Sequence, residues 1–148
     1  MKRVVITINR QYGSGGKTIG YMLAEKLGIP CYSREILQRA SEESGINESM
    51  FNARDERLKR LPKFLLSTNV YSGELLPPES KEFTSDQNLF NYEAEIIKKY
   101  AAEGSCVLIG RCADFVLKDD PDMISVYVHA DHDFQMKSAL ERVSMSEK

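Results

Sequence analysis

The 148-residue sequence contains little cysteine, no long hydrophobic run and almost no net charge. Its three cysteines, Cys31, Cys106 and Cys112, are odd in number and form no CxxC pair, which argues against a disulfide framework or a zinc site. No apolar run approaches the roughly 18–20 residues that span a bilayer. The 20 basic and 22 acidic residues give a net charge of −2, which supplies no basic field for binding nucleic acid or anionic lipid. We therefore expect a cytoplasmic protein that binds neither nucleic acid nor membranes.

The sequence does have the composition of one folded domain over residues 1–148, with 42% hydrophobic and 28% charged residues. Short apolar runs alternate with segments of helical periodicity. Residues 4–8 and 106–109 show no polar alternation, which is typical of strands buried on both faces of a parallel sheet. Further strands are expected at residues 31–32 and 123–129. Strands that alternate with helices predict a three-layer α/β/α fold around a parallel sheet.

Capping residues and helix breakers delimit the expected helices. Thr84 and Gln87 form a capping box, and Gly28 and Pro30 supply a stop signal. The expected helices lie between the glycine turn and Gly28, between Ser33 and Gly45, between Asn47 and Pro62, between Thr84 and Gly104, and over residues 134–143. Residues 62–85 break the helical pattern, yet they are too apolar for a solvated linker, and we expect a flexible flap there.

A glycine-rich turn between residues 4–8 and the first helix is the most specific chemical signal. The turn and the start of the helix supply six residues of a predicted phosphate-binding set: Gly13, Ser14, Gly15, Gly16, Lys17 and Thr18. They match the second half of the pattern G-x-x-x-x-G-K-[ST], with Gln11 at the first glycine position. The glycines let backbone N–H groups converge on an anion at a helix N-terminus. Lys17 is expected to reach the β- and γ-phosphates, and the Thr18 hydroxyl is expected to bind Mg²⁺.

Two arginines and an aspartate are candidates for binding a second, acceptor substrate. Phosphoryl transfer between anionic nucleotides needs fixed cations, because charge spreads over the oxygens of the transferred group. Arg111 directly follows residues 106–109, at the sheet edge where ligands of parallel α/β sheets bind. Arg34 lies in the first turn of a helix and either binds the acceptor or is a solvated surface residue. Asp114 either accepts hydrogen bonds from a base or sugar, or caps a short helix.

Five blocks of the sequence resemble the cytidylate kinase-like family. They are residues 6–16 (ITINRQYGSGG), 24–30 (AEKLGIP), 33–37 (SREIL), 104–115 (GSCVLIGRCADF) and 126–130 (VYVHA). The first and fourth blocks carry Gly13 and Arg111. The resemblance implies a P-loop nucleoside monophosphate kinase fold, in which Gln11 is a normal residue of the loop. It also implies that a phosphoryl group passes from ATP, with Mg²⁺, to CMP or dCMP, so that the partners are small-molecule nucleotides.

The sequence departs from the pattern of this family at several positions. Ser33 stands where relatives usually have an aspartate, and Gln135 and Ser138 stand where such kinases tend to place arginines. The family also continues past residue 148 with an arginine-bearing lid, a last helix and a fifth strand, so the resemblance implies a C-terminally truncated chain without lid or fifth strand. These departures favour one alternative, a nucleotide-binding regulatory module without turnover. A P-loop kinase of another small metabolite is a second alternative.

Apolar residues of the expected flap leave two functions open. The flap contains Leu65, Leu66, Val70, Tyr71, Leu75 and Leu76. These side chains either cover the base of the acceptor or form a contact between the subunits of a homo-oligomer.

Overall fold

The computed structural model describes residues 2–60 and 73–146. The chain divides into two compact units, of which the first comprises Met1–Ser33 and Tyr100–Lys148 and the second comprises Arg34–Lys99.

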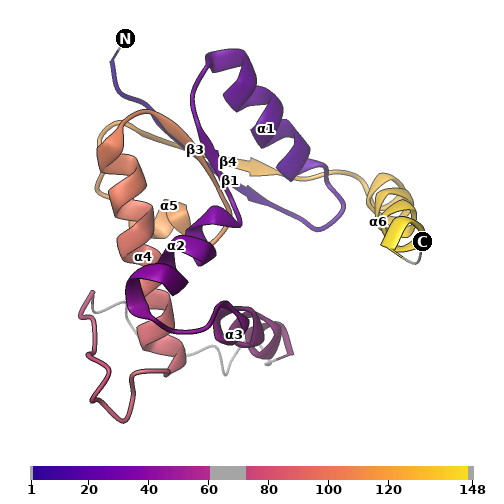
Figure 1. Ribbon diagram of the computed structural model, residues 1–148. Coiled ribbons are helices and arrows are strands. Elements are labelled where there is room, and N and C mark those ends of the chain that lie inside the picture. Colours follow the sequence, from indigo (N-terminus) through magenta and orange to yellow (C-terminus); the bar gives the residue numbers. More distant parts are fainter. Residues whose placement is uncertain (1, 61–72, 147–148) are drawn as a thin grey trace. The chain divides into compact units, whose positions relative to one another are not determined.

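Four strands of the described residues form one parallel sheet in the first unit (Figure 1). They are β1 (Val5–Arg10), β2 (Cys31–Tyr32), β3 (Cys106–Ile109) and β4 (Met123–Val128), in the spatial order β2-β3-β1-β4. β1 pairs with both β3 and β4, so that Ile8 lies opposite Ile109 on one side and Val126 on the other. The predicted parallel α/β fold is therefore confirmed, and its two central strands are the two runs without polar alternation.

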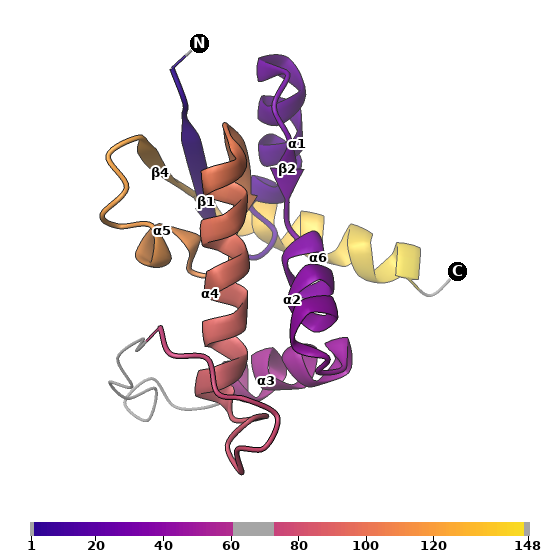
Figure 2. The same ribbon diagram turned by 60° about the vertical axis from the view of Figure 1, so that its left-hand side comes forward.

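Both faces of the central strands are buried. One face packs against Ala24 of α1 (Gly16–Leu27), and its core residues are Ile6, Ile8, Val107 and Ile109. The alternate residues Val5, Thr7, Cys106 and Leu108 are also buried and point to the opposite face, because successive side chains of a strand alternate. Figure 2 shows α1 and α5 (Ala113–Val116) on opposite sides of β1. Burial raises the pKa of the Cys106 thiol to about 11.

A glycine inside α1 lets the helix lie close to the sheet. A methyl group at Gly20 would sit 2.7 Å from Cδ1 of Ile109 and 3.1 Å from Cδ1 of Ile8. The helix ends at Gly28, whose left-handed backbone (φ 66°) directs the next amides back to the last turn of the helix. The predicted stop signal at this glycine is therefore confirmed.

The second unit is helical in its described residues. It contains α2 (Glu35–Ser44), α3 (Glu48–Arg60) and most of α4 (Asp86–Glu103), which continues into the first unit. The amide of Ser49 donates to the side chain of Asn47 at 2.9 Å, as expected for the predicted cap of α3. Inside the unit, Arg54 pairs with Glu93 at an Nη1–Oε1 distance of 3.2 Å, and both side chains are buried.

Residues 73–85 are held to α4 by buried amide side chains. Asn88 donates to the carbonyls of Phe83 and Leu76 and accepts from the amide of Leu76, and Asn91 donates to the carbonyl of Glu74. The first part of the predicted flap, including Leu65, Leu66, Val70 and Tyr71, lies outside the described residues.

The N-cap of α4 differs from the prediction. Ser85, not Thr84, precedes the helix: its hydroxyl accepts from the amide of Asn88 at 3.2 Å, and its carbonyl accepts from that of Leu89 at 2.9 Å. Two adjacent hydroxyl residues satisfy the same sequence rule, and the helix begins one residue later than the predicted capping box requires.

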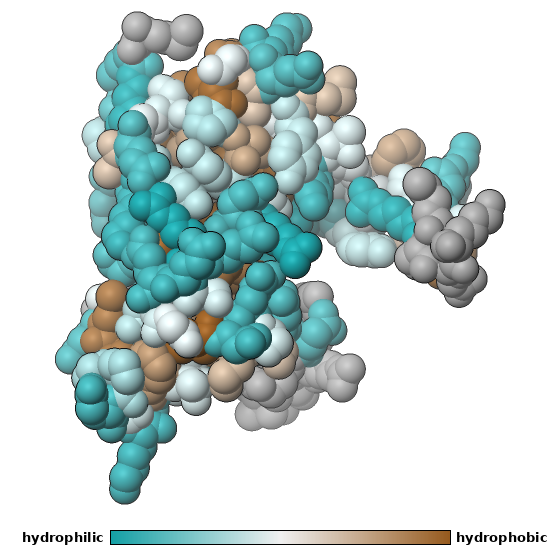
Figure 3. Space-filling model, in the orientation of Figure 1, coloured by the Kyte–Doolittle hydropathy of each residue, from teal (hydrophilic) through white to brown (hydrophobic). Residues whose placement is uncertain are grey.

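The last element of the first unit is α6 (His132–Ser146), which follows β4. The carboxylate of Asp131 accepts a hydrogen bond from the amide of Phe134 at 2.9 Å and caps the helix. Hydrophilic residues predominate on the face seen in Figure 3. None of the helices in the described part of the chain is long and apolar enough to cross a membrane.

Candidate phosphate-binding site

The glycine turn between β1 and α1 alternates between two backbone conformations. Gly13 (φ 78°) and Gly15 (φ 80°) are left-handed, and Ser14 between them is not. Gly15 caps α1, and its carbonyl accepts the first helical hydrogen bond from Ile19 at 3.0 Å. Alternation of this kind turns successive N–H groups toward one concavity, and the N-terminus of α1 adds the positive end of its dipole. The turn is therefore shaped to hold an anion.

Ser14 stabilises the turn from within. Its side chain is buried, its hydroxyl donates to the carbonyl of Gln11 at 2.8 Å, and its amide donates to the same oxygen at 3.2 Å. The amide of Gly16 points toward the Ser14 hydroxyl at 3.4 Å. Ser14 thus fixes the conformation of the loop rather than presenting its hydroxyl to solvent.

Lys17 and Thr18 lie in the first turn of α1, and both are exposed. Because Gly15 is the cap, Gly16 is the first helical residue and Lys17 is the second. The Lys17 ammonium lies 5.8 Å from the centre of the Tyr21 ring, one turn further along the helix. Both predicted residues are thus next to the loop, on its helical side.

Arg10, at the end of β1, is a residue of this site that the sequence analysis did not identify. A methyl group at Gly16 would lie 2.7 Å from Cβ of Arg10, and one at Gly110 would lie 2.7 Å from its Nη1 atom. The side chain of Arg10 therefore runs from the first residue of α1 to the end of β3. The two glycines that leave space for it were visible in the sequence, but nothing there linked them to Arg10.

The turn after β3 has a strained backbone. Gly110, Arg111 and Cys112 are all left-handed, with φ angles of 74°, 59° and 53°. Consecutive non-glycine residues in this region are uncommon, and such strain concentrates at functional sites. Asp114 is the second residue of α5, whose cap is Cys112, so the alternative in which Asp114 caps a helix is wrong.

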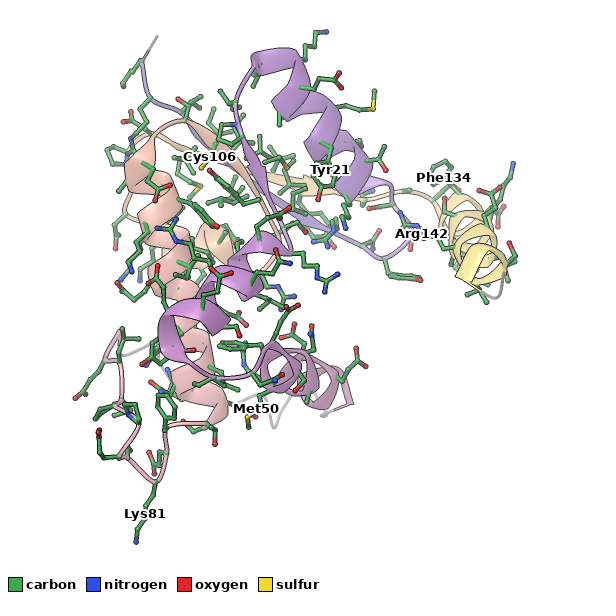
Figure 4. All side chains as sticks on the ribbon, in the orientation of Figure 1. Tyr21, Met50, Lys81, Cys106, Phe134 and Arg142 are labelled. Carbon is green, nitrogen blue, oxygen red and sulfur yellow. The ribbon has the colours of Figure 1, made fainter. Side chains whose placement is uncertain are left out.

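Three guanidinium groups surround the carboxyl ends of β1 and β3. Burial lowers the pKa of Arg10 most, and the charges of Arg111 and Arg142 lower it further, while Tyr21 acts in the opposite direction. Arg142 extends from α6 and is labelled with Tyr21 in Figure 4. No carboxylate of the described residues is among the groups that shift the pKa of Arg10. The arrangement favours binding of an anion, which would offset the repulsion between these cations.

Gln135 of α6 closes the outer side of the loop. Its amide nitrogen donates to Oε1 of Gln11 at 2.8 Å and also to the carbonyl of Ala130. A methyl group at Gly13 would lie 2.6 Å from the carbonyl oxygen of Gln135. The side chain of Gln135 thus binds the loop itself, and Ser138 lies half-buried on the same helix.

Arg34 belongs to the second unit, unlike the loop, Arg10 and Arg111. Its Nε atom lies 3.4 Å from Oε1 of Glu48, and its side chain is largely exposed. An exposed pair of this kind contributes little to stability. The structure therefore brings together the loop and Arg111, and it shows Arg34 only with its partner on α3.

The residues of the loop fit a magnesium ion that arrives with a nucleotide. Mg²⁺ prefers oxygen ligands and is usually held by one or two protein groups together with water and substrate phosphates. The exposed hydroxyl of Thr18 is an oxygen ligand in the first turn of α1. No group of three His, Cys, Asp or Glu side chains that could hold a metal occurs in the described ranges. A metal held between a hydroxyl and phosphates does not require such a group.

The fold and the loop together define an α/β protein with a glycine turn between the first strand of a parallel sheet and the N-terminus of α1. The chain belongs to the cytidylate kinase-like family, whose sequence model matches residues 5–148.

One solved structure is similar to the chain over most of its length. It is the crystal structure of an uncharacterized protein from Eubacterium ventriosum ATCC 27560, with 27% sequence identity and a TM-score of 0.61. The match covers 96% of this chain and 63% of that protein, so the present chain spans less than two thirds of its structural neighbour. No curated protein matches the sequence.

Proposed function

We propose that this protein transfers a phosphoryl group from ATP to a nucleoside monophosphate, with CMP or dCMP as acceptor. The observation that carries the proposal is the alternating backbone of residues 13–16 at the N-terminus of α1, next to Arg10, on which the positive charges of Arg111 and Arg142 act. A concavity of N–H groups with cations at its edge suits a polyphosphate. The choice of cytidylate rests on the family to which the chain belongs.

The donor nucleotide binds through the loop. Backbone N–H groups of the loop and of the first turn of α1, other than that of Ser14, hold its phosphates, and Lys17 neutralises the charge that develops on the β- and γ-phosphates. Mg²⁺ bound with the nucleotide and the Thr18 hydroxyl would supply a further positive charge on the same oxygens. None of these groups needs to change its protonation state during transfer.

The acceptor is bound on the arginine side of the loop. Arg111 holds the phosphate of the monophosphate, and Asp114 accepts hydrogen bonds from its base or sugar. An acceptor oxygen attacks the γ-phosphorus in line, the bond from that phosphorus to the β-phosphate oxygen breaks, and ADP leaves. A phosphate oxyanion is already a nucleophile, so the reaction needs no general base.

The proposal is tested by measuring ADP release from ATP and Mg²⁺ with CMP, dCMP, UMP and AMP as acceptors. We expect release that depends on CMP or dCMP, and at least a hundredfold loss in Lys17→Ala, since fixed cations at a developing charge contribute about 2.7–4 kcal/mol. A protein that is folded and binds ATP, but releases no ADP with any monophosphate, would contradict kinase activity. A non-nucleotide alcohol is included as a further acceptor. ADP release that depends on this alcohol and on none of the monophosphates would support a kinase of another small metabolite.

One structural observation favours the alternative of a nucleotide-binding module without turnover. Gln135, at a position where related kinases tend to carry arginine, is hydrogen-bonded to Gln11 and Ala130 and so stabilises the loop instead of adding charge. This alternative predicts ATP binding by calorimetry that Lys17→Ala weakens, without ADP release in the same acceptor panel.

A further inference from the structure

The first residue of α1 has no room for a side chain, because Arg10 occupies that space. A methyl group at Gly16 would meet Cβ of Arg10 at 2.7 Å, Cδ of Arg10 at 3.2 Å and Cβ of Val128 at 3.1 Å. Gly16 is the last glycine of the pattern G-x-x-x-x-G-K-[ST], and Lys17 directly follows it. The side chain that lies beside Gly16 is that of Arg10 from β1.

The guanidinium of Arg10 lies at the end of β3. A Cβ atom at position 110 would lie 2.7 Å from its Nη1 atom, which is too close. The guanidinium therefore fits there only because residue 110 is a glycine. Gly110 donates its amide to the carbonyl of Ile8 at 2.9 Å, which holds the turn after β3 against β1. Arg10 is therefore positioned by a glycine at each end of its side chain.

The charges that act on Arg10 are mainly positive. Burial lowers its pKa most, and Arg111 from the turn after β3 and Arg142 from α6 lower it further, while Tyr21 raises it. Within residues 2–60 and 73–146, no carboxylate contributes to that shift. Arg10 is exposed at the end of β1, so an anion from solvent can reach its guanidinium and would offset the repulsion from Arg111 and Arg142.

We propose that Arg10 is a second phosphate-binding cation of the loop, whose guanidinium, held beside Gly110 at the end of β3, contacts the terminal phosphates of the bound nucleotide. This inference rests on the proposed phosphate-binding function of the loop and adds Arg10 to Lys17. Arginine suits the role because its planar guanidinium donates two parallel hydrogen bonds to a phosphate.

The experiment measures binding of ATP with Mg²⁺, and of inorganic tripolyphosphate with Mg²⁺, to the wild-type chain and to Arg10→Gln by calorimetry. Tripolyphosphate has no base or sugar, so it reports phosphate contacts alone. We expect Arg10→Gln to weaken both ligands at least tenfold, and Arg10→Lys to keep part of the affinity. The unfolding temperature of Arg10→Gln should not fall with the affinity, because the substitution also removes repulsion with Arg111 and Arg142. If Arg10 only stabilised the fold, Arg10→Gln would lower the unfolding temperature and leave the affinity of the folded protein for both ligands unchanged.

The matched control is Arg39→Gln, which removes the same charge from an ion pair with Glu43 in the second unit and should leave binding within twofold of wild type. Wild-type binding with unchanged affinity in Arg10→Gln would overturn the inference and leave the proposed function standing. Absence of wild-type binding would overturn both. Should Arg10→Gln not fold, Gly110→Ala decides, since its methyl group would lie 2.7 Å from Nη1 of Arg10 and must displace the guanidinium from outside the loop. Weaker binding then supports the inference, and unchanged binding overturns it.

Discussion

Two glycines of the loop share one backbone conformation but have different surroundings. Gly13 and Gly15 are both left-handed, a region that costs other residues roughly 1–2 kcal/mol. A methyl group at Gly15 would meet nothing within 4 Å, whereas one at Gly13 would meet the carbonyl oxygen of Gln135 at 2.6 Å. At Gly15, glycine is therefore favoured by the backbone conformation alone, which is a local cause. At Gly13, the contact with Gln135 of α6 is a second cause, and that contact is not local.

This pair gives a prediction at the scale of the residue. Gly15→Ala should lower the free energy of unfolding by about 1–2 kcal/mol, which is the backbone strain alone. Gly13→Ala should cost more, because the new methyl group must also push Gln135 and the start of α6 away. Urea unfolding of the two variants measures the difference. Equal losses in both variants would contradict the contact between the loop and Gln135.

At the scale of the element, the ion pairs that join helices of the second unit differ in how deeply they are buried. Arg54 of α3 and Glu93 of α4 pair with side-chain exposures of 10% and 1%, and Arg54 also lies over the ring of Phe90 at 5.2 Å. By contrast, Glu43 of α2 pairs with Lys99 and Arg39 at the surface. Removing Glu93 would leave the buried Arg54 with a longer pair to the more exposed Asp55 at 3.6 Å, whereas water compensates a charge that loses its partner at the surface.

We accordingly expect Glu93→Gln to lower the free energy of unfolding by about 3–5 kcal/mol. The control Glu43→Gln should cost about 0–1 kcal/mol, because water replaces its exposed partners. Chemical denaturation followed by far-UV circular dichroism measures both. A loss at Glu93 no larger than the loss at Glu43 would show that the α3–α4 pair does not stabilise this unit.

At the scale of the whole molecule, one ion-pair cluster joins the beginning of the chain to the turn before β4. Arg3 donates to Asp120 at 2.6 Å and to the carbonyl of Ala101 at 2.9 Å, and its guanidinium lies 3.5 Å from Asp122. The hydrogen bond from Arg3 holds the pKa of Asp120 below its usual range, while burial of the carboxyl acts in the opposite direction. These contacts connect three segments that are distant in the sequence.

Because the folded-state pKa of Asp120 is lowered, its contribution to stability is fully present above the ordinary carboxyl value of about 4 and is lost as the pH falls through the lowered value. We expect the free energy of unfolding to decrease between pH 5 and pH 2, and to decrease less steeply in Arg3→Gln. Urea titrations across this range measure the slope. The control is Lys2→Gln, which removes an exposed pair with Asp122. Identical slopes in wild type and Arg3→Gln would contradict the prediction.

Local patterns in the sequence predicted most of the strands and helices of the fold. Unbroken apolar runs predicted β1 and β3, since a strand buried on both faces tolerates no polar residue, and Gly28 predicted the end of α1. The cap of α4 was predicted one residue too early, because Thr84 and Ser85 satisfy the same rule. For the site, the sequence predicted the glycine turn and Lys17 from their spacing and Arg111 from its place after a buried strand, and these roles stay predictions.

The amino-acid sequence by itself determined the order of strands and helices and the glycine loop between β1 and α1, because these depend on backbone preferences and on neighbours close in the chain. Only the tertiary structure decided that Arg10 passes beside Gly16, that Arg142 of α6 approaches it and that Gln135 closes the loop. Each of these contacts joins residues on different elements, and no local preference specifies which side chain fills the space that a distant glycine leaves.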